Sequence, residues 1–491
     1  MGTFKKSNTL RGYGLFLTLL LLWLGSLLGA LWFDNVLAWT AGLLYIAYDT
    51  WLIAYVAWKT RHLAEPPVAP ATITTHTPTT LGVLIPARNE AAVLAQTLDA
   101  LLDQNDRPDA ILVIDDGSTD QTLDLLETRY GVICRGHGLF SSSRLPQLCV
   151  LRKTNSGKAD SLNQAWPLLN TDVVVTLDAD TRLEPGAMAG LRGAFEREPE
   201  LAACCGVLRP RCAPGLRGRL YEAFQRFEYL RAFLSRAAWM QSNALLLVSG
   251  AFAGYRREVL TRLGGYDPKN LVEDYELIHR LHRHAHERGL DWRVRVVHEA
   301  RADTDAPASL RAFLHQRRRW FAGFLQTQFA YRAMHGDPRY GAVGTLMLPI
   351  KAVDTLQPVF GVTALVLLLI FIQRGAPVTP AIIAIIGGKL AIDFGYHLWA
   401  VRLYHRWLRQ VPGPRVWIGA MLTTLAEPFS FQLLRHCGAI WGWVVLLTGR
   451  QDWAPQRPSG ELGPVNAMFR RCVAGQKSAK QGATKEFGGS K

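Results

Sequence analysis

The sequence has few charged residues and no recognisable cysteine pattern. Charged residues make up 19% of its 491 positions, and the seven cysteines form no Cys-x-x-Cys pair and no regular spacing. The first feature argues against a disordered chain, and the second against a zinc ribbon or a disulfide scaffold. Apolar residues, in contrast, reach 49%, and the net charge is +15. That charge suggests nucleic acid, an anionic substrate or the cytoplasmic face of a membrane as a partner.

Two long apolar runs near the N-terminus predict a transmembrane hairpin. Residues 13–33 carry no charge and residues 37–58 carry only Asp49, and each run is long enough for a membrane-spanning helix of about 20 residues. Basic residues flank the pair on both outer sides, so the positive-inside rule puts both ends in the cytoplasm. A cleaved signal peptide ending near Ala30 is the alternative, but the apolar run is too long for one.

Apolar segments return in the C-terminal part of the chain. They lie at residues 341–372, 378–403 and 416–449, and each contains charged residues. Such charges either pair between buried helices or line a polar path, and both interpretations stay open here. Basic residues on both sides of the last run predict an inside location for both of its ends, which one crossing cannot satisfy. We therefore expect four to six passes, with the last run either a re-entrant hairpin or an exception to the rule.

The segment between these apolar regions alternates strand and helix patterns. Four apolar runs predict strands, at residues 81–86, 110–114, 148–151 and 173–177. The alternation predicts an α/β fold with a parallel, Rossmann-like sheet, in which ligands bind at the carboxyl ends of the strands. One stretch, residues 131–147, does not fit this pattern and is interpreted as a loop insertion near the ligand site.

Acidic motifs stand at two of the predicted strand ends. They are Asp115-Asp116-Gly117-Ser118 after the second strand and Asp178-Ala179-Asp180 after the fourth. Two carboxylates two positions apart suit a hard divalent ion that bridges a diphosphate. In isolation such a motif is more often a turn or a helix cap, so it gains weight only from its companions.

Further motifs follow in a fixed order. The whole series is Pro86-Ala87-Arg88-Asn89-Glu90, Asp115-Asp116-Gly117-Ser118-Thr119-Asp120, Gly157-Lys158-Ala159-Asp160-Ser161-Leu162-Asn163, Asp178-Ala179-Asp180, Ser249-Gly250-Ala251-Phe252, Gly264-Gly265-Tyr266-Asp267, Glu273-Asp274 and Gln316-Arg317-Arg318-Arg319-Trp320. The series resembles the membrane-bound family 2 glycosyltransferases, and among them the processive synthases of poly-N-acetylglucosamine, cellulose and hyaluronan. The resemblance covers residues 81–332 by motif and the membrane segments by layout. It implies a GT-A nucleotide-sugar domain inserted between N-terminal and C-terminal transmembrane helices.

The resemblance also implies a role for each motif residue in an inverting sugar transfer. Substrate contacts are implied for Glu90, Asp115, Asp116, Lys158, Asp178, Gln316, Arg319 and Trp320, and Mg²⁺ or Mn²⁺ ligation for Asp180 and Asp178. Asp274, with Glu273 beside it, is implied as the general base that deprotonates the acceptor hydroxyl. By spacing alone, these two acids also fit an ordinary helix N-terminus.

The motif with Trp320 lies in a basic amphipathic pattern. Apolar residues recur at helical spacing from Leu310 to Phe329, and no acid occurs between Ser309 and Arg332. This pattern predicts a helix in the headgroup region of a membrane, which would bring the acceptor site to the membrane surface.

The predicted order of segments follows from these assignments. It is a transmembrane hairpin at 1–62, a linker at 63–80, a cytosolic GT-A domain at 81–308, an interface helix at 309–340, a transmembrane region at 341–449 and a basic cytoplasmic tail at 450–491. We expect an integral protein of the plasma or inner membrane that transfers sugar from a UDP-sugar, with UDP-N-acetylglucosamine favoured, to a β-linked polysaccharide that is exported. A UDP-glucose-dependent β-glucan synthase and a non-processive glycolipid enzyme are the alternatives.

The expected partners follow from the same interpretation. They are a nucleotide-sugar donor, a polysaccharide acceptor, the membrane, and accessory export or synthase subunits. Nucleic acid is not expected, because the basic residues flank membrane segments and form no groove-reading motif. An inactive membrane scaffold is disfavoured, since every acid that the family motifs require is present.

Overall fold

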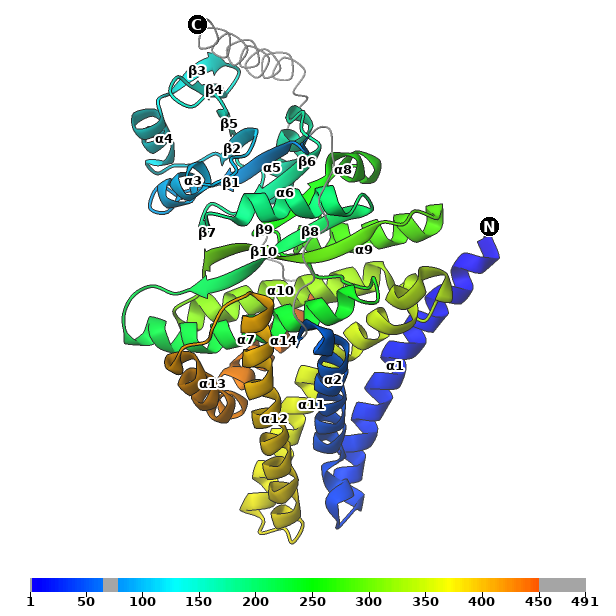
Figure 1. The fold of residues 1–491 in the computed structure, drawn as a ribbon. Helices are drawn as coiled ribbons and strands as arrows, with labels where there is room; N and C mark the ends of the chain where they lie inside the picture. Colours follow the sequence, from blue (N-terminus) through cyan, green and yellow to red (C-terminus); the bar gives the residue numbers. More distant parts are fainter. Residues whose placement is uncertain (1, 65–77, 450–491) are drawn as a thin grey trace, which may run out of the picture.

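The computed structural model describes residues 2–64 and 78–449. The tail predicted at 450–491 and most of the linker predicted at 63–80 lie outside these residues. Figure 1 shows three levels: a sheet with its covering helices, two long helices across its base, and a bundle of apolar helices beyond them. The two crossing helices are α7 (Leu216–Met240) and α10 (Leu310–Ala330).

A single mixed sheet forms the centre of the upper level. Its strands are β1 (Leu81–Ala87), β2 (Ala110–Asp116), β3 (Val132–Gly136), β4 (Leu139–Ser142), β5 (Leu148–Lys153), β6 (Val173–Leu177), β7 (Thr181–Leu183), β8 (Leu201–Arg211), β9 (Phe252–Arg256) and β10 (Arg293–Asp305). Their spatial order is β3-β4-β5-β2-β1-β6-β9-β8-β10-β7. The four strands predicted from the sequence are β1, β2, β5 and β6, which pair in parallel with one another. Their nearly continuous burial is typical of parallel strands that are covered on both faces.

The sheet continues on both sides of this parallel core. Antiparallel β9 joins β6 to β8, and β8 pairs in parallel with the long β10. On the other side, the segment predicted as a loop insertion forms the antiparallel hairpin β3–β4 beside β5, so the loop prediction was wrong. The hairpin turn runs through Gly136, His137 and Gly138, all with positive φ. A Cβ on Gly138 would lie 2.4 Å from the Arg152 carbonyl oxygen, so this approach needs a glycine.

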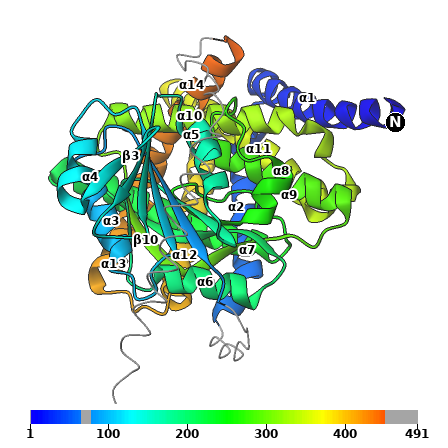
Figure 2. The same cartoon turned by 90° about the horizontal axis from the view of Figure 1, so that it is seen from above.

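Helices pack on the sheet and carry the loops at its edge. They are α3 (Leu94–Leu102), α4 (Thr122–Tyr130), α5 (Lys158–Ala165), α6 (Ala187–Arg197), α8 (Arg257–Leu263) and α9 (Glu273–Arg288). Helix α5 packs against β1 and β2, α6 against β8 and β10, and α8 against β9. Figure 2, seen from above, shows the sheet running between these helices.

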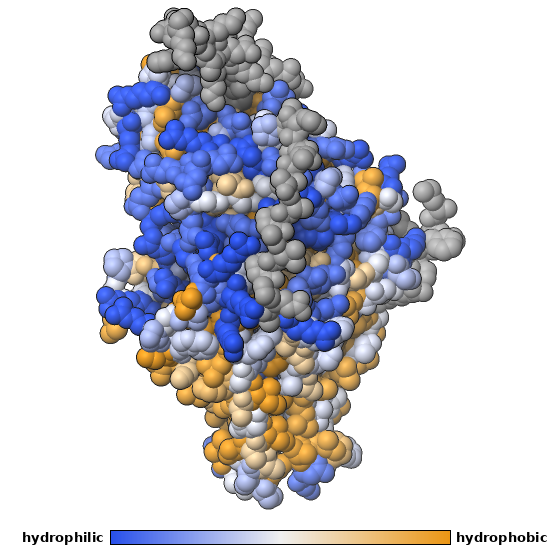
Figure 3. All heavy atoms as spheres, viewed as in Figure 1, coloured by the Kyte–Doolittle hydropathy of each residue, from blue (hydrophilic) through white to orange (hydrophobic). Residues whose placement is uncertain are grey.

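Four helices of the lower level are long and apolar enough to cross a membrane. They are α1 (Gly2–Trp32), α2 (Thr40–Thr60), α11 (Leu348–Gln373) and α12 (Thr379–Trp407). Figure 3 shows an abrupt change from a hydrophilic upper surface to a hydrophobic lower one at the base of the sheet level. This surface is that of a membrane protein.

The last apolar run is broken into two shorter helices. They are α13 (Pro414–Ala426) and α14 (Phe431–Leu447), with a 3-10 turn at Glu427–Phe429 between them. Pro428 lies in that turn, where it removes a backbone donor and prevents one continuous helix. Helix α14 packs along α10 rather than standing apart from it.

Candidate functional site

The loops after β1 and β2 are tied together at the carboxyl edge of the sheet. The Asn89 side-chain oxygen accepts hydrogen bonds from the backbone N–H groups of Thr119 (2.8 Å) and Asp120 (3.3 Å). The backbone N–H of Asn89 donates to Ser118 Oγ (3.0 Å). Asn89 has φ +59°, a left-handed conformation that asparagine tolerates better than most residues. It therefore positions its neighbour Glu90, whose N–H donates to Thr122 Oγ1 (3.0 Å).

The two acids at the end of β2 have different environments. Asp116 accepts hydrogen bonds from Lys153 Nζ (2.6 Å) and from the N–H groups of Ser156 (2.9 Å) and Gly157 (2.8 Å). Burial disfavours its charged form, but these donors outweigh that effect and hold the pKa of Asp116 below its ordinary value. Asp116 thus anchors the loop that begins α5.

Asp115, in contrast, keeps one oxygen unused by hydrogen bonds. Its Oδ1 accepts the Ser118 N–H (2.9 Å), whereas Oδ2 is buried and has no hydrogen-bond donor among the described residues. The Arg152 Nε atom lies 3.5 Å from Oδ2, which gives the carboxylate a nearby positive charge without a bond of good geometry.

Four carboxylates influence one another near the end of β6, namely Glu90, Asp178, Asp180 and Asp305. Burial, together with the charges of Asp178 and Asp305, raises the pKa of Asp180 to about 6. Burial and the charges of Asp180 and Asp178 raise the pKa of Glu90 to about 7. Mutual repulsion of this kind marks a place that is short of positive charge and that a cation would stabilise.

Lys158 joins the β6 acids to the start of α9. Its Nζ lies 2.5 Å from Asp178 Oδ1 and 3.6 Å from Glu273 Oε1. Burial alone would favour the neutral amine, but the charges of Asp178, Glu273 and Asp274 raise the pKa of Lys158 above its ordinary value. The ammonium therefore stays charged at the centre of the predicted site.

Asp274 occupies the first turn of α9 and points to the loop before β9. Its Oδ2 accepts the N–H of Gly250 (2.7 Å) and its Oδ1 the N–H of Tyr275 (2.8 Å). Burial, and secondly the charge of Glu273, raises the pKa of Asp274, which makes it a stronger base than a solvated aspartate. A Cβ on Gly250 would lie 3.0 Å from Oδ2, so this glycine permits the close approach.

The predicted interface helix α10 begins one residue after its N-cap Ser309 and carries the last motif. Arg319 Nη1 donates to the Leu271 carbonyl oxygen (3.4 Å), which brings the motif to the loop that leads into Glu273. The buried Gln316 Oε1 has no hydrogen-bond partner among the described residues. Trp320 is half-buried, and the Arg317 guanidinium lies over its ring at 4.6 Å.

The structure thus brings most of the predicted site residues to one edge, but not all into contact. Lys158, Asp178, Glu273 and Asp274 form one connected group, and Glu90 joins Asp180 through their charges. Gln316, Arg319 and Trp320 approach from α10, and within the described part of the chain they form no hydrogen bond or ion pair with these acids. The roles assigned to all of them stay predictions.

Sequence reasoning missed the groups that hold α10 in place. Arg317 makes two hydrogen bonds to the carboxylate of Glu228 on α7 (2.9 and 2.7 Å), and Arg435 on α14 lies 3.7 Å from the same carboxylate. Such bidentate pairs fix geometry as well as charge. No local signal links residues so far apart in the chain, so only the fold reveals them.

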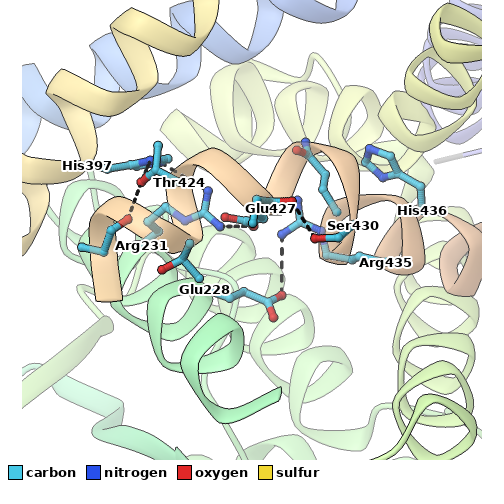
Figure 4. Close-up of polar contacts among 12 residues, drawn as sticks. Glu228, Arg231, His397, Thr424, Glu427, Ser430, Arg435 and His436 are labelled. Carbon is cyan, nitrogen blue, oxygen red and sulfur yellow. Dashed lines mark hydrogen bonds and ion pairs between the residues drawn. The ribbon is translucent and has the colours of Figure 1, made fainter. Parts of the chain in front are cut away.

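Polar residues inside the membrane level also pair with one another. Figure 4 shows Arg231 of α7 reaching Glu427, and His397 of α12 beside Thr424 of α13 (3.0 Å). Lys389 lies between Asp49, at 2.6 Å, and Asp393. The pairing interpretation therefore holds for these charges.

The same residues line a cavity of about 310 Å³ between α2, α11, α12 and α14. Its lining combines Asp49, Lys389 and Glu427 with aromatic rings such as Trp39 and Tyr45. The interpretation as a polar path therefore stays open as well.

Comparison with known proteins finds a protein family whose sequence profile matches part of this chain. Residues 82–264 match the sequence profile described as "Glycosyl transferase family 2". The probable glycosyltransferase YdaM of Bacillus subtilis (strain 168) is 28% identical over 50% of this chain and 54% of its own length. A poly-beta-1,6-N-acetyl-D-glucosamine synthase of Staphylococcus aureus (strain COL) is 27% identical over 49% of this chain and 53% of its own length. The chain spans about half the length of the curated relatives it matches.

A solved structure shares the fold. The mannosyltransferase PcManGT from Pyrobaculum calidifontis, in complex with GDP-Man and Mn²⁺, superposes with a TM-score of 0.52 at 21% identity and covers 79% of this chain and 99% of that one. The predicted fold class, a GT-A-type α/β domain between N-terminal and C-terminal apolar helices, is confirmed.

Proposed function

Because the chain carries a family 2 glycosyltransferase domain at residues 82–264, we propose that it is an inverting enzyme that transfers sugar from a UDP-sugar to a growing β-linked polysaccharide. The observation that carries this proposal is the connected group of Lys158, Asp178, Glu273 and Asp274 at the carboxyl edge of the sheet. It combines a partly buried cation, for a departing diphosphate, with a basic carboxylate, for an attacking hydroxyl, in one site.

Asp274 is the general base in this proposal. Its raised pKa supports proton transfer, because a stronger base takes the acceptor proton more readily as the hydroxyl attacks the anomeric carbon. The hydrogen bond from the Gly250 N–H fixes the carboxylate and leaves its outer lone pairs for the acceptor. A single in-line displacement inverts the anomeric centre, so an α-linked donor gives a β-linked product.

Lys158 and Arg319 stabilise the negative charge that develops on the departing diphosphate. Lys158 remains an ammonium through the reaction, since neighbouring carboxylates raise its pKa. Arg319 can bind a phosphate with two parallel hydrogen bonds. Asp115 is the proposed acceptor for a nucleoside N–H or hydroxyl, while Asp116, bound by three donors, shapes the loop around it.

The acids after β6 fit a divalent cation that is shared with the donor. The described residues contain no group of three or more His, Cys, Asp or Glu side chains arranged to hold a metal alone. Asp178 and Asp180 would supply two carboxylates and the diphosphate the remaining oxygens, a common arrangement for Mg²⁺. The raised pKa of Asp180 is consistent with a missing positive charge. Bound Mg²⁺ or Mn²⁺ would neutralise charge on the diphosphate.

The membrane level supports an acceptor that leaves through the protein. The cavity of about 310 Å³ lies within the range of small-molecule sites, about 300–1,000 Å³. Its mixture of rings and charged groups suits a sugar, whose faces pack on aromatic rings and whose hydroxyls form hydrogen bonds. Helix α14 packs along α10 and so connects this level with Trp320. We infer a cytoplasmic catalytic domain and export across the plasma or inner membrane, with accessory export subunits as partners.

Two donor sugars and two kinds of product, an exported chain or a single added sugar, are compatible with the proposed transfer. UDP-N-acetylglucosamine is favoured, because a poly-N-acetylglucosamine synthase is among the relatives. UDP-glucose, giving a β-glucan, and single transfer to a lipid are the other candidates. The four long apolar helices and the cavity between them favour a chain that is exported over a single transfer.

A product assay distinguishes these candidates. Membranes that contain the full chain are incubated with radiolabelled UDP-N-acetylglucosamine or UDP-glucose, with Mg²⁺ or Mn²⁺, and the products are separated by size. We expect a ladder of long chains from one donor. A single added sugar in the lipid fraction would establish the glycolipid alternative, and no consumption of either donor would contradict the proposed activity.

A further inference from the structure

A second cavity lies on the opposite side of β10 from Asp180. Its volume is about 860 Å³, and its walls come from the ends of β8 and β10, the first half of α7, the end of α12 and helix α13. Asp303 lines this cavity, whereas the next residue, Thr304, directs its hydroxyl to Thr181 (2.9 Å) and Asp180 (3.4 Å). Because successive residues of a strand face opposite sides, the cavity is separate from the site of sugar transfer.

The cavity is strongly basic. Five arginines line it, namely Arg209, Arg211, Arg219, Arg226 and Arg415, against the two acids Glu222 and Asp303. Asp303 pairs with Arg209 (2.8 Å) and Arg211 (3.5 Å), and Glu222 pairs with Arg226 (2.9 Å). Arg219 and Arg415 are exposed, and neither has an ion-pair partner within residues 78–449. Two guanidinium groups therefore remain available to an anion.

The cavity lies at the level of a membrane headgroup layer. Val401 and Tyr404 in its wall belong to the last turns of α12, which is one of the helices long enough to cross a membrane. Figures 1 and 3 show α7 and α13 at the height where the surface turns from hydrophilic to hydrophobic. A phosphate in this position would be at the depth that lipid phosphates occupy.

Apolar surface continues outward from the basic cavity. Helix α13 exposes Ile418, Leu422 and Leu425 by 55%, 64% and 55%, and Leu216 at the start of α7 is exposed by 86%. A soluble phosphate ion would leave these side chains in water, whereas the acyl chains of a lipid would cover them. The polar and apolar surfaces together therefore match an amphiphile with an anionic head.

We propose that this cavity, between α7, α12, α13 and the ends of β8 and β10, binds the phosphate headgroup of an anionic phospholipid. Arg219 and Arg415 contact the phosphate, and the exposed leucine and isoleucine side chains of α13 contact the acyl chains. The site does not depend on the proposed sugar transfer, and its ligand is neither donor nor acceptor. Lipid bound at this site would hold the upper level, which contains the sheet, against the membrane beside α12.

A lipid titration tests this proposal. The purified full chain in neutral detergent is titrated with dioctanoyl phosphatidylglycerol and with dioctanoyl phosphatidylcholine, and bound lipid is measured by native mass spectrometry. We expect tighter binding of phosphatidylglycerol. Arg415→Gln should weaken it about fivefold, and Arg219→Gln combined with Arg415→Gln about 25-fold, because each arginine near a lipid phosphate contributes about 1 kcal/mol.

The matched control removes the same charge outside the cavity. Arg217→Gln combined with Arg402→Gln changes two exposed arginines that do not line the cavity, and it should leave phosphatidylglycerol binding unchanged. Equal losses in the two double variants would overturn the proposal, since binding would then follow surface charge alone. Displacement of the lipid by an equal concentration of inorganic phosphate would also overturn it. If the cavity double variant does not fold, Arg415→Gln against Arg402→Gln gives the same comparison.

Discussion

At the scale of single residues, the environment of Asp274, the proposed general base, predicts how turnover depends on pH. Burial raises the pKa of this carboxyl above the ordinary value of about 3.9. A general base acts only when deprotonated, so the turnover rate should fall as the pH drops through that raised pKa and level off above it. We therefore expect the acidic limb of the kcat profile to lie above the ordinary pKa of an aspartate.

The control for this profile is donor binding, measured over the same pH range by fluorescence or calorimetry. Binding should persist where turnover is already falling. An acidic limb centred near pH 4, or one that follows donor binding, would remove Asp274 as the group that controls the rate.

The paired Asp116 makes a separate prediction about stability. Its pKa is depressed in the folded protein, so its contribution is present above the unfolded value of about 3.9 and is lost as the pH falls through the folded value. Asp116→Asn should lower the free energy of unfolding at pH 7 by about 3 kcal/mol, because it removes the nearer of the two carboxylates that pair with the buried Lys153, the other being Asp160 at 3.7 Å. The difference in free energy of unfolding between Asp116→Asn and the wild type should become smaller as the pH falls.

Thermal unfolding in detergent, followed by circular dichroism, measures this effect. Asp103→Asn, at an exposed position after α3, is the matched control and should match the wild type. A difference between Asp116→Asn and wild type that stays constant from pH 7 to pH 3 would contradict the assignment of charge as its source.

At the scale of elements, close packing of α14 on α10 determines where Trp320 lies. Gly438 and Gly442, four residues apart on α14, face α10 directly. A Cβ on Gly438 would lie 2.7 Å from Arg317 Cβ, and one on Gly442 would lie 2.5 Å from the Arg318 carbonyl oxygen. Small residues at this spacing allow two helices to approach closely within a membrane protein.

Gly442→Ala should therefore push α14 away from α10. We expect a loss of about 1–3 kcal/mol in stability, as for other overpacked contacts, together with slower turnover and unchanged donor binding. Gly387→Ala on α12, where an added methyl group meets nothing within 4 Å, is the matched control. The thermal midpoint and kcat of both variants provide the measurement. Equal behaviour of the two variants would contradict the packing argument.

The elements also show what the sequence could and could not predict. The parallel strands β1, β2, β5 and β6 were predictable, because buried parallel strands are continuous apolar runs, and the motifs at their ends were found with them. The hairpin β3–β4 was not, since its exposed and buried residues follow no clear alternation around two glycines. The link from Glu228 to Arg317 was also beyond prediction, because it depends on how α7 crosses α10.

At the scale of the whole molecule, metal should affect activity but not folding. The two carboxylates after β6 are too few to make a metal part of the folded core. Removal of divalent ions with EDTA should abolish turnover and leave the thermal midpoint unchanged, and added Mg²⁺ or Mn²⁺ should restore the rate. Asp180→Ala should need a higher metal concentration.

The control for this experiment is Asp124→Ala, which removes an exposed acid on α4, away from the acids after β6. It should keep the metal requirement of the wild type. A fall in the thermal midpoint on chelation, or an unaltered metal requirement in Asp180→Ala, would contradict the proposed arrangement.

The central claim is that one sheet edge, with Asp274 as its base, transfers sugar from a nucleotide donor. The most direct measurement is the initial rate of UDP release from UDP-N-acetylglucosamine by purified wild type, Asp274→Asn and Glu287→Gln, the last at an exposed position on the same helix. Loss of a general base predicts a rate about 10²- to 10⁴-fold lower in Asp274→Asn and an unchanged rate in Glu287→Gln. A wild-type rate from Asp274→Asn, with the protein folded and the donor bound, would contradict the account.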